Sequence, residues 1–265
     1  MFFMLSVIII AKNEEMNIRR CLESVSFADE IIVLDSGSTD ATVAVAEEYT
    51  SKVFSTDWQG YGIQKQRALS RATGDWVLNL DADESLSLSL QKEIQSVITD
   101  NKADAFRIPI QMNFYNQPLK YSSSPQRHIR LFKKIKANYS EDIVHEKIIL
   151  TPESHVLKLK HSINHHSFKD LSHALYKMNK YSSYSAKIRI SSEKNPSVTK
   201  IMMSTTWMFL RCYLLQGGFL DGQIGFLFAT YNAQGTFYRG MKQLYRDVHI
   251  DTLPQITTSK EDEVF

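Results

Sequence analysis

Three carboxylates stand within four residues in the segment Asn79-Leu80-Asp81-Ala82-Asp83-Glu84, directly after the apolar run Trp76-Val77-Leu78. Such a run is typical of a buried strand, and open α/β sheets bind ligands at the carboxyl ends of their strands. Crowded carboxylates repel one another unless a cation lies among them, and hard divalent cations prefer oxygen ligands. The segment therefore indicates a metal site on Asp83 and Asp81. The alternative is a helix N-terminus, where the helix dipole favours Asp83 and Glu84.

Strands and helices must position this segment. Apolar runs at 5–10, 31–34, 53–54 and 76–80 predict four strands. Helical patterns follow each of them, and we expect Asn13 to cap the first helix and Ser38 or Thr39 to cap the second, which runs to about residue 49. The later helices are expected at 60–72 and around 90–98. This alternation predicts βαβ units and a parallel sheet.

The pattern changes after residue 100. Segments 105–112, 129–133 and 156–159 predict a less regular set of strands, and the chain then reads as helical over about 171–190, 198–216 and 222–246. Residues 201–215 are the most apolar stretch, but they are short and contain Arg211, so they do not predict a transmembrane helix. They predict a helix that lies on a membrane interface or packs on the main domain.

Composition sets the broad class. At 265 residues and 43% apolar content, the chain can form one sizeable α/β domain with an extension. Two distant cysteines favour a reducing compartment, and the apolar start without a basic region predicts a first strand rather than a signal peptide. Residues 1–100 hold 8 basic and 16 acidic residues, whereas residues 101–250 hold 22 and 9. A basic second part attracts nucleic acid, anionic lipid or a phosphorylated glycan, unless it is an ordinary solvated surface.

The loops after the predicted strands should meet at one edge of the sheet and form a nucleotide pocket. Asp35 can accept hydrogen bonds from a base or ribose, or cap its own turn. Lys65 and Arg67 can face phosphates, and Asp83 with a divalent cation can neutralise a diphosphate. The chain contains no Gly-x-Gly-x-x-Gly and no Gly-Lys-Ser/Thr motif, so neither a dinucleotide fold nor a P-loop kinase is indicated.

A family resemblance rests on these motifs. The chain resembles family 2 glycosyltransferases in three places. Leu5–Glu15 resembles their opening strand, and Ile32–Asp40 resembles their second strand and turn. Gln64–Leu69 followed by Gly74–Glu84 resembles the segment that enters their D-x-D motif. A narrower resemblance, to the lipopolysaccharide core β-glucosyltransferase branch, is carried by four later segments: Arg130–Lys133, Val144–Lys147, His165–Phe168 and Gly217–Gly222.

The resemblance implies a fold, a donor and an acceptor. The fold is an α/β fold of the GT-A nucleotide-diphospho-sugar transferase type, with a mainly parallel central sheet and a helical C-terminal extension. It divides into a catalytic domain at 1–168 (nucleotide-sugar binding at 1–98, acceptor side at 99–168), helices at 169–250 and a polar tail at 251–265. The expected donor is a UDP-sugar, UDP-glucose or UDP-galactose, with Mn²⁺ or Mg²⁺ and inversion at the anomeric carbon.

The expected acceptor is an inner-core heptose of lipopolysaccharide or lipooligosaccharide, carried on a phosphorylated lipid-linked oligosaccharide. Residues 121–128 lack the Trp-Tyr-Pro-type acceptor loop of that branch, so the acceptor stays open. We expect a cytoplasmic protein, peripheral on the inner membrane, with no nucleic-acid partner.

Site residues follow from the motifs. The favoured base is Glu146, with Asp142 second, and the alternative for Glu146 is a surface pair with Lys147. Acceptor contacts are expected from Arg127, Arg130 and His145. His161, His165 and His166 supply a metal or phosphate contact, or only local hydrogen bonds. The expected metal ligands are Asp83 and Asp81, and the donor-binding residues are Ala11, Asn13, Glu14, Asp35, Ser36, Lys65, Arg67, Asp81, Ala82 and Asp83.

Two other functions use the same architecture. A sugar-1-phosphate nucleotidyltransferase needs a Gly-rich loop after the first strand, but Ala11–Glu15 has no glycine and two acids. A non-catalytic nucleotide- or glycan-binding protein would tolerate loss of the D-x-D acids, which this chain keeps. A transferase acting on a different glycan or protein acceptor is the remaining alternative.

Overall fold

The chain forms two compact units. The computed structural model describes residues 3–115, 117–122, 126–140, 147–168, 171–191 and 196–245. The first unit comprises Met1–Gln111 with Pro125–His166, and the second comprises Met112–Ser124 with Ser167–Phe265. Residues 112–124, which the sequence assigned to the catalytic domain, thus cluster with the helices. The expected tail at 251–265 lies outside the described residues.

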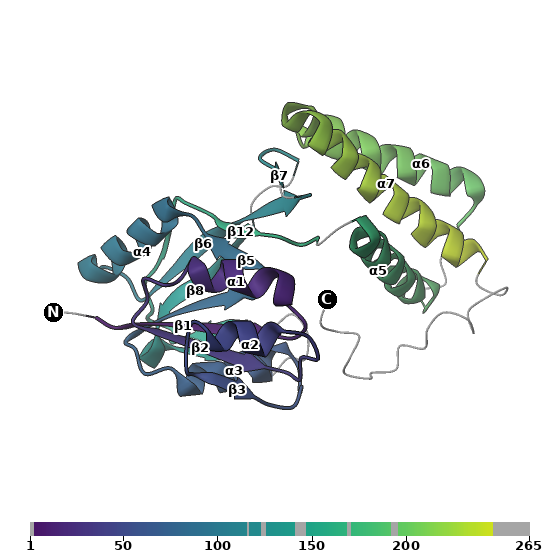
Figure 1. Cartoon of the computed structure of the whole chain (residues 1–265). Coiled ribbons are helices and arrows are strands. Elements are labelled where there is room, and N and C mark those ends of the chain that lie inside the picture. The colour runs from purple at the N-terminus through teal and green to yellow at the C-terminus, as the bar shows by residue number, and fades with distance from the viewer. Residues whose placement is uncertain are drawn as a thin grey trace. The chain divides into compact units, whose positions relative to one another are not determined.

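A mixed sheet organises the first unit (Figure 1). Its parallel part has the order β3-β2-β1-β4, and its remaining strands continue in the order β8-β6-β12-β5. The strand β8 is antiparallel to both β4 and β6, whereas β11 pairs parallel with β6. The bounds are β1 Leu5–Ala11, β2 Glu30–Asp35, β3 Val53–Ser55, β4 Trp76–Asp81, β5 Glu84–Leu86, β6 Ala105–Phe114, β8 Gln126–Lys133, β11 Val156–Lys158 and β12 Ile163–His165.

The register aligns the carboxyl ends of the parallel strands. Ile10 is opposite both Leu34 of β2 and Asp81 of β4, and Ala11 is opposite Asp35. All seven residues of β1 are buried, as expected for a parallel strand covered on both faces. The loops that follow β1, β2 and β4 therefore meet at one edge, as the sequence predicted.

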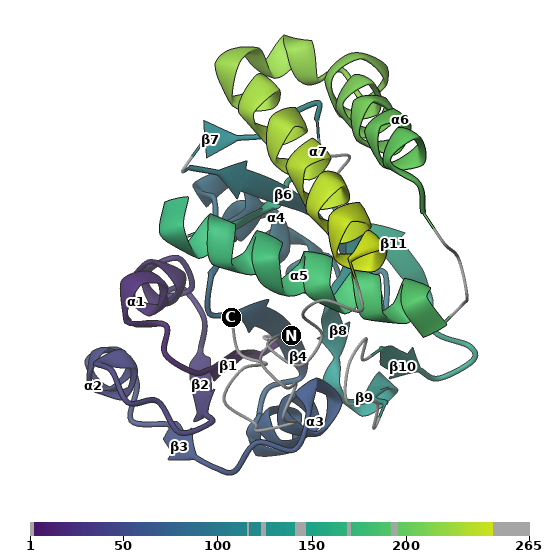
Figure 2. The same ribbon diagram turned by 90° about the vertical axis from the view of Figure 1, so that its right-hand side faces the viewer.

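Helices cover both faces of this sheet (Figure 2). Val7, Ile9 and Leu78 point to one face and pack with apolar residues of α1 Glu15–Glu23, α2 Thr42–Glu47 and α4 Leu88–Asp100. Ile8 and Val77 point to the other face, against α3 Tyr61–Arg71 and β9 Ala137–Tyr139. The strand β9 follows the short 3-10 helix Lys134–Lys136 and pairs with β10 Ile148–Leu150.

Two predicted helix caps are wrong. The first helix has Glu14 at its N-cap rather than Asn13, and the second has Ala41 rather than Ser38 or Thr39. Neither observed cap residue makes a side-chain capping bond. Asn13 and Ser38 instead hydrogen-bond between the loops that follow β1 and β2.

The second unit is built mainly from helices. It contains α5 Leu171–Ser191, α6 Val198–Leu210, a π-helical turn Arg211–Leu215, a 3-10 turn Gly218–Asp221 and α7 Gly222–Leu244. These match the predicted helices closely. The helix α7 packs against both α5 and α6. No helix in the described part of the chain is long and apolar enough to cross a membrane.

Residues 112–122 join the helices of the second unit. Phe114 and Leu119 form a small core with Ile224, and β7 Gln117–Pro118 pairs with the end of β6. Asp221 accepts hydrogen bonds from the backbone amides of 120–122 and from the hydroxyl of Ser122 at 2.5 Å. A carboxylate thus holds the strand-and-loop segment on the start of α7.

Candidate functional site

Hydrogen bonds join the loops at the carboxyl edge of the parallel strands. The backbone amide of Ser36 donates to the carbonyl of Ala11 at 2.9 Å, and the amide of Asn13 donates to Ser38 Oγ at 2.9 Å. Asn13 Oδ1 in turn accepts from the amide of Thr39 at 2.8 Å. Asn13 has a φ of 54°, a left-handed conformation that asparagine tolerates. Its side chain therefore ties the first loop to the second and does not cap α1.

Asp35 is buried and caps its own turn. Its Oδ2 accepts from the amides of Gly37 and Ser38, both at 2.9 Å, and its Oδ1 accepts from Ser38 Oγ at 2.5 Å. A carboxylate has about four acceptor positions, so these bonds leave room for a further donor. The turn fixes the carboxylate beside the loop after β1, and its contact with a nucleotide stays a prediction.

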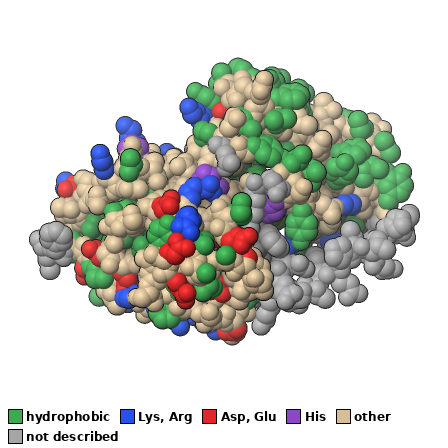
Figure 3. All heavy atoms as spheres, in the orientation of Figure 1, with side chains coloured by type: hydrophobic (Ala, Val, Ile, Leu, Met, Phe, Trp, Pro, Cys, Tyr) green, Lys and Arg blue, Asp and Glu red, His purple; other side chains and the backbone are tan. Residues whose placement is uncertain are grey.

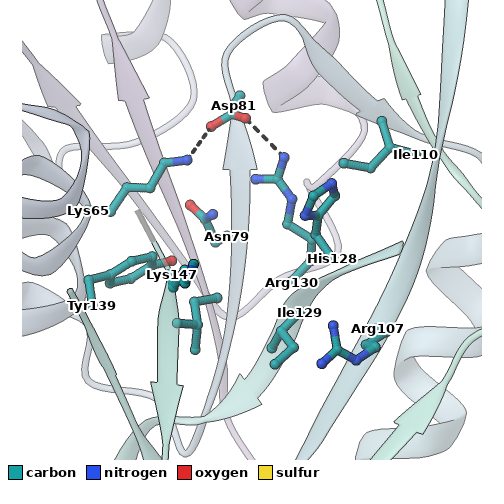
Figure 4. Close-up of a pocket in the computed structure, with 11 residues that line it drawn as sticks. Lys65, Asn79, Asp81, Arg107, Ile110, His128, Ile129, Arg130, Tyr139 and Lys147 are labelled. Atoms are coloured by element: carbon teal, nitrogen blue, oxygen red, sulfur yellow. Dashed lines mark hydrogen bonds and ion pairs between the residues drawn. The ribbon is translucent and has the colours of Figure 1, made fainter. Parts of the chain in front are cut away.

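A basic pocket of about 440 Å³ opens at the end of β4 (Figure 4). Its four cations are Lys65, Arg107, Arg130 and Lys147, and Asp81 is the carboxylate among its lining residues. The remaining lining residues are Asn79, Ile110, His128, Ile129, Tyr139 and Ile148. An excess of positive charge in a concave site is typical of phosphate binding.

Asp81 holds two of these cations. Its Oδ1 lies 3.0 Å from Lys65 Nζ and its Oδ2 lies 3.0 Å from Arg130 Nη2. Arg130 Nη2 also contacts Glu84 Oε1 at 2.7 Å, and Glu84 Oε2 accepts from the amide of Asp81. Burial opposes ionisation of Asp81, but the charges of Arg130 and Lys65 outweigh it and hold the pKa of Asp81 well below its usual range.

Glu84 is the buried member of this network. Burial raises its pKa to about 7 against the attraction of Arg130, and the negative charge of Asp81 adds to the rise. The alternative interpretation of Glu84 as a helix N-terminal residue is wrong, since Glu84 begins the short strand β5. Its side chain instead anchors Arg130 beneath the pocket.

Asp83 lies beside His165. The distance from Asp83 Oδ2 to His165 Nε2 is 3.0 Å. Burial lowers the pKa of His165, but Asp83 outweighs that effect and raises it to about 9. His166 donates its amide to the carbonyl of Asp83, and Ser85 Oγ lies 3.2 Å from its Nε2. Burial and the charge of Arg20 lower the pKa of His166 to about 4.

The donors near Asp83 fit a cation that shares its ligands with a substrate. Among the described residues, no group of three or more His, Cys, Asp or Glu side chains is arranged to hold a metal. Mg²⁺ is typically held by one or two carboxylates together with substrate phosphates and water. Asp83, with His165 next to it, satisfies that pattern, whereas both oxygens of Asp81 already contact cations.

Other predicted residues have local partners. Arg67 Nη1 contacts Asp57 Oδ1 at 3.0 Å. Glu14 Oε2 accepts from Asn17, and His161 Nδ1 contacts Glu93 Oε2 at 2.8 Å, away from the pocket. Ala82 is buried between the two acids, Ser36 Oγ accepts from Gln64, and Arg127 is exposed on β8. Asp142, His145 and Glu146 lie outside the described residues.

Sequence reasoning missed several lining residues. Asn79 Oδ1 is buried and makes no hydrogen bond within the described part of the chain, so it can receive a ligand donor. Arg107 and His128 enter the pocket because β6 and β8 pair antiparallel, with Arg107 opposite Ile129 and Ile108 opposite His128. Asn79 could have been found from its place in the D-x-D strand. The other two carry no signal until the register is known.

The parallel strands, the loops at their carboxyl edge and the acidic turn after β4 define a nucleotide-sugar transferase of the GT-A type. The chain belongs to glycosyltransferase family 2. The model of "Glycosyl transferase family 2" matches residues 6–152, more than half of the chain.

Two relatives that are named as glycosyltransferases are similar to this chain over most of its length. An "Uncharacterized glycosyltransferase" of Rickettsia bellii is 32% identical over 89% of this chain and 84% of its own length. The "Lipopolysaccharide core biosynthesis glycosyltransferase LpsC" of Rhizobium meliloti is 30% identical over 90% of this chain and 91% of its own. Among solved structures, S. aureus TarS 1–349 aligns with 93% of this chain and 92% of that chain, at 17% identity and a TM-score of 0.46.

Proposed function

We propose that this glycosyltransferase transfers a hexose, glucose, from a UDP-sugar to an inner-core heptose of lipopolysaccharide or lipooligosaccharide, with inversion and with a divalent cation. The proposed UDP-sugar donor is supported by the basic pocket beside Asp81 and Asp83. The similarity to LpsC, whose name gives lipopolysaccharide core biosynthesis, supports the acceptor part.

The pocket's charges suit a nucleoside diphosphate. Lys65 is buried and reaches the end of β4, so its ammonium can face a phosphate oxygen as well as Asp81. Arg107 and Lys147 add two exposed cations. We assign Asp35, which its own turn fixes, as the hydrogen-bond acceptor for the nucleobase or ribose of the donor. The loops at 11–14 and 36–38 lie around it.

Asp83 is the residue that we assign to the metal, Mn²⁺ or Mg²⁺, with His165 beside it. Asp81, the second predicted ligand, keeps Lys65 and Arg130 in place and faces the ribose or a metal-bound water. When bound, the cation neutralises charge on the diphosphate and stabilises the leaving group.

The reaction needs a base as well as a leaving-group site. The acceptor hydroxyl oxygen forms a bond to the anomeric carbon while the bond from that carbon to the diphosphate oxygen breaks. The hydroxyl proton passes to a carboxylate, for which we propose Glu146 with Asp142 as the alternative. The bonding electrons leave on the diphosphate, whose new charge Lys65 can stabilise. Arg127 and His145 are proposed acceptor contacts, whereas Arg130 is held by carboxylates.

A thermal-shift panel of nucleotide sugars with and without Mn²⁺ tests the donor site. We expect a rise in Tm with UDP-sugars that requires the metal, and release of UDP when a heptose-terminated core acceptor is added. No response to any nucleotide sugar would favour the non-catalytic alternative. Turnover of a nucleoside triphosphate and a sugar phosphate would favour a nucleotidyltransferase.

We also propose that the protein works on the cytoplasmic face of the inner membrane as a peripheral protein. Large apolar side chains are exposed around α6 and the start of α7, where Figure 3 shows hydrophobic surface. They are Met202, Met203, Trp207, Leu210, Leu214, Leu215, Phe219, Leu220, Phe226 and Leu227. Nine cations and one carboxylate among the described residues of this unit complement an anionic lipid surface.

Sedimentation with phosphatidylglycerol vesicles tests this placement. Trp207→Glu with Leu214→Glu should abolish co-sedimentation, whereas Ile135→Glu, which alters an 88% exposed side chain of the first unit, should not. Equal sedimentation of all three proteins would contradict the proposal.

A further inference from the structure

The first turn of α3 carries a buried carboxamide beside the loops of the proposed donor site. Gln64 lies in this turn and is fully buried. Its Nε2 donates to two acceptors, Ser36 Oγ at 3.0 Å and the carbonyl of Asp57 at 2.7 Å. Ser36 belongs to the turn after β2, and Asp57 belongs to the loop after β3. One side chain therefore ties the turn that Asp35 caps to the loop that follows β3.

The carboxamide of Gln64 uses both its nitrogen and its oxygen in this network. An amide nitrogen carries two donors, and each has an acceptor here. The Oε1 of Gln64 accepts from Arg67 Nη1 at 3.2 Å. A buried polar group that loses its partner costs free energy. The network therefore favours an amide at this position, because a carboxylate offers no donor and an apolar side chain offers neither a donor nor an acceptor.

Arg67, one turn further along α3, holds the same loop. Its Nη1 donates to Thr56 Oγ1 and to the carbonyl of Asp57, both at 2.9 Å. The backbone amide of Thr56 donates to the carbonyl of Asp35 at 2.9 Å. The loop after β3 is therefore fixed to Asp35 through its backbone and to α3 through the side chains of Gln64 and Arg67.

The next residue of α3 contacts a different part of the proposed donor site. Lys65 Nζ lies 3.0 Å from Asp81 Oδ1 at the end of β4 (Figure 4). Successive residues of a helix are separated by about 100° around its axis, so Gln64 and Lys65 reach different loops. The first turn of α3 thus contacts the Asp35 turn through Gln64, and the side that we assign to the diphosphate through Lys65.

We propose that Gln64 is a positioning residue for the nucleoside part of the donor. It acts through Asp35, because it holds the Asp35 turn and the loop after β3 in one fixed arrangement. The role rests on the proposed function, in which Asp35 receives the base or ribose. Binding groups that are already ordered lose less conformational freedom when a ligand binds. Removal of the Gln64 hydrogen bonds should therefore weaken binding of the nucleoside and leave binding of the phosphates unchanged.

Calorimetric titration of the full chain with UDP and with pyrophosphate, both with Mg²⁺, tests this role. Gln64→Met keeps the length of the side chain and removes its hydrogen bonds. We expect its Kd for UDP to rise about tenfold, as for one lost hydrogen bond, and its Kd for pyrophosphate to stay at the parent value. Gln64→Glu keeps an acceptor for Arg67 but has no donor when ionised, so it should show the same selective loss.

A purely structural role would give a different result. Partial unfolding lowers the fraction of protein that binds, and it affects UDP and pyrophosphate equally. Equal loss for both ligands, or a parent Kd for UDP in both Gln64 variants, would overturn the proposal. Gln91→Met is the matched control, because Gln91 Nε2 donates to the carbonyl of Ser24 at 3.0 Å and joins α4 to the end of α1. If the parent protein binds no UDP, the proposed donor is wrong, and the role of Gln64 is wrong with it.

Discussion

His165 Nε2 lies 3.0 Å from Asp83 Oδ2, although 82 residues separate them in the chain. The two meet because β12 pairs antiparallel with β5, with His165 opposite Glu84. The amide of His166 also donates to the carbonyl of Asp83. The acidic turn after β4 is therefore fixed from its far side by a strand that comes late in the first unit.

We predict that Asp83→Ala abolishes metal-dependent sugar transfer and leaves the protein folded. Asp83 is half-buried, and its removal deletes a proposed metal ligand without breaking the ion pairs of Asp81. Transfer from UDP-glucose over a Mn²⁺ titration measures the effect, and circular dichroism checks the fold. Asp100→Asn, at the exposed end of α4, is the control. Transfer by Asp83→Ala at the parent rate would show that the metal assignment is wrong.

The sequence predicted the parallel strands and the acidic turn, because long apolar runs and alternating helices carry a strong periodic signal. It could not predict the approach of His165. The strands β5 and β12 have three residues each, too few to show a period of two. Their pairing depends on tertiary context, so sequence reasoning left the role of His165 open.

The position of Arg130 also depends on strand pairing that the sequence could not predict. It was predicted to bind the acceptor, but β8 inserts antiparallel beside β4, with Leu78 opposite Leu131. This register puts Arg130 next to the end of β4, where Asp81 and Glu84 engage its guanidinium. A contact of Arg130 with an acceptor stays a prediction.

Arg130→Met should destabilise the first unit by about 3–5 kcal/mol, because it removes the buried cation that the carboxylates of Asp81 and Glu84 share. Denaturant unfolding measures the loss. Arg127→Met is a matched control on the same strand, since Arg127 is exposed. A difference below about 1 kcal/mol between the two variants, the range of surface ion pairs, would mean that the network adds little stability.

Glu146→Gln should retain UDP-sugar binding and lose sugar transfer, because an amide cannot take up the proton from the hydroxyl of the acceptor sugar. Isothermal titration with UDP-glucose and Mn²⁺ measures binding, and single-turnover transfer measures chemistry. Glu153→Gln, which alters an exposed residue that pairs with Lys136, is the control for loss of a carboxylate. If Glu146→Gln transfers sugar normally and Asp142→Asn does not, the base is Asp142.

Glu30 gives a pH dependence of folding that is independent of the site. It is buried at the start of β2 and accepts hydrogen bonds from Ser6, Lys52 and Thr73. Burial alone would raise its pKa, but these partners hold the pKa of Glu30 at about 2, below the ordinary value of 4.5. A depressed carboxyl pKa stabilises the folded state above about pH 4.5, and the stabilisation is lost as the pH falls toward 2.

The free energy of unfolding of the parent should therefore exceed that of Glu30→Gln by an amount that shrinks by about 3 kcal/mol between pH 6 and pH 2. Urea unfolding of both proteins across this range measures the difference. Glu47→Gln removes one carboxylate from an exposed position on α2 and controls for the change in net charge. A difference between the parent and Glu30→Gln that stays constant from pH 6 to pH 2 would contradict the assignment, since a carboxylate with an ordinary pKa in the folded state gives no such linkage.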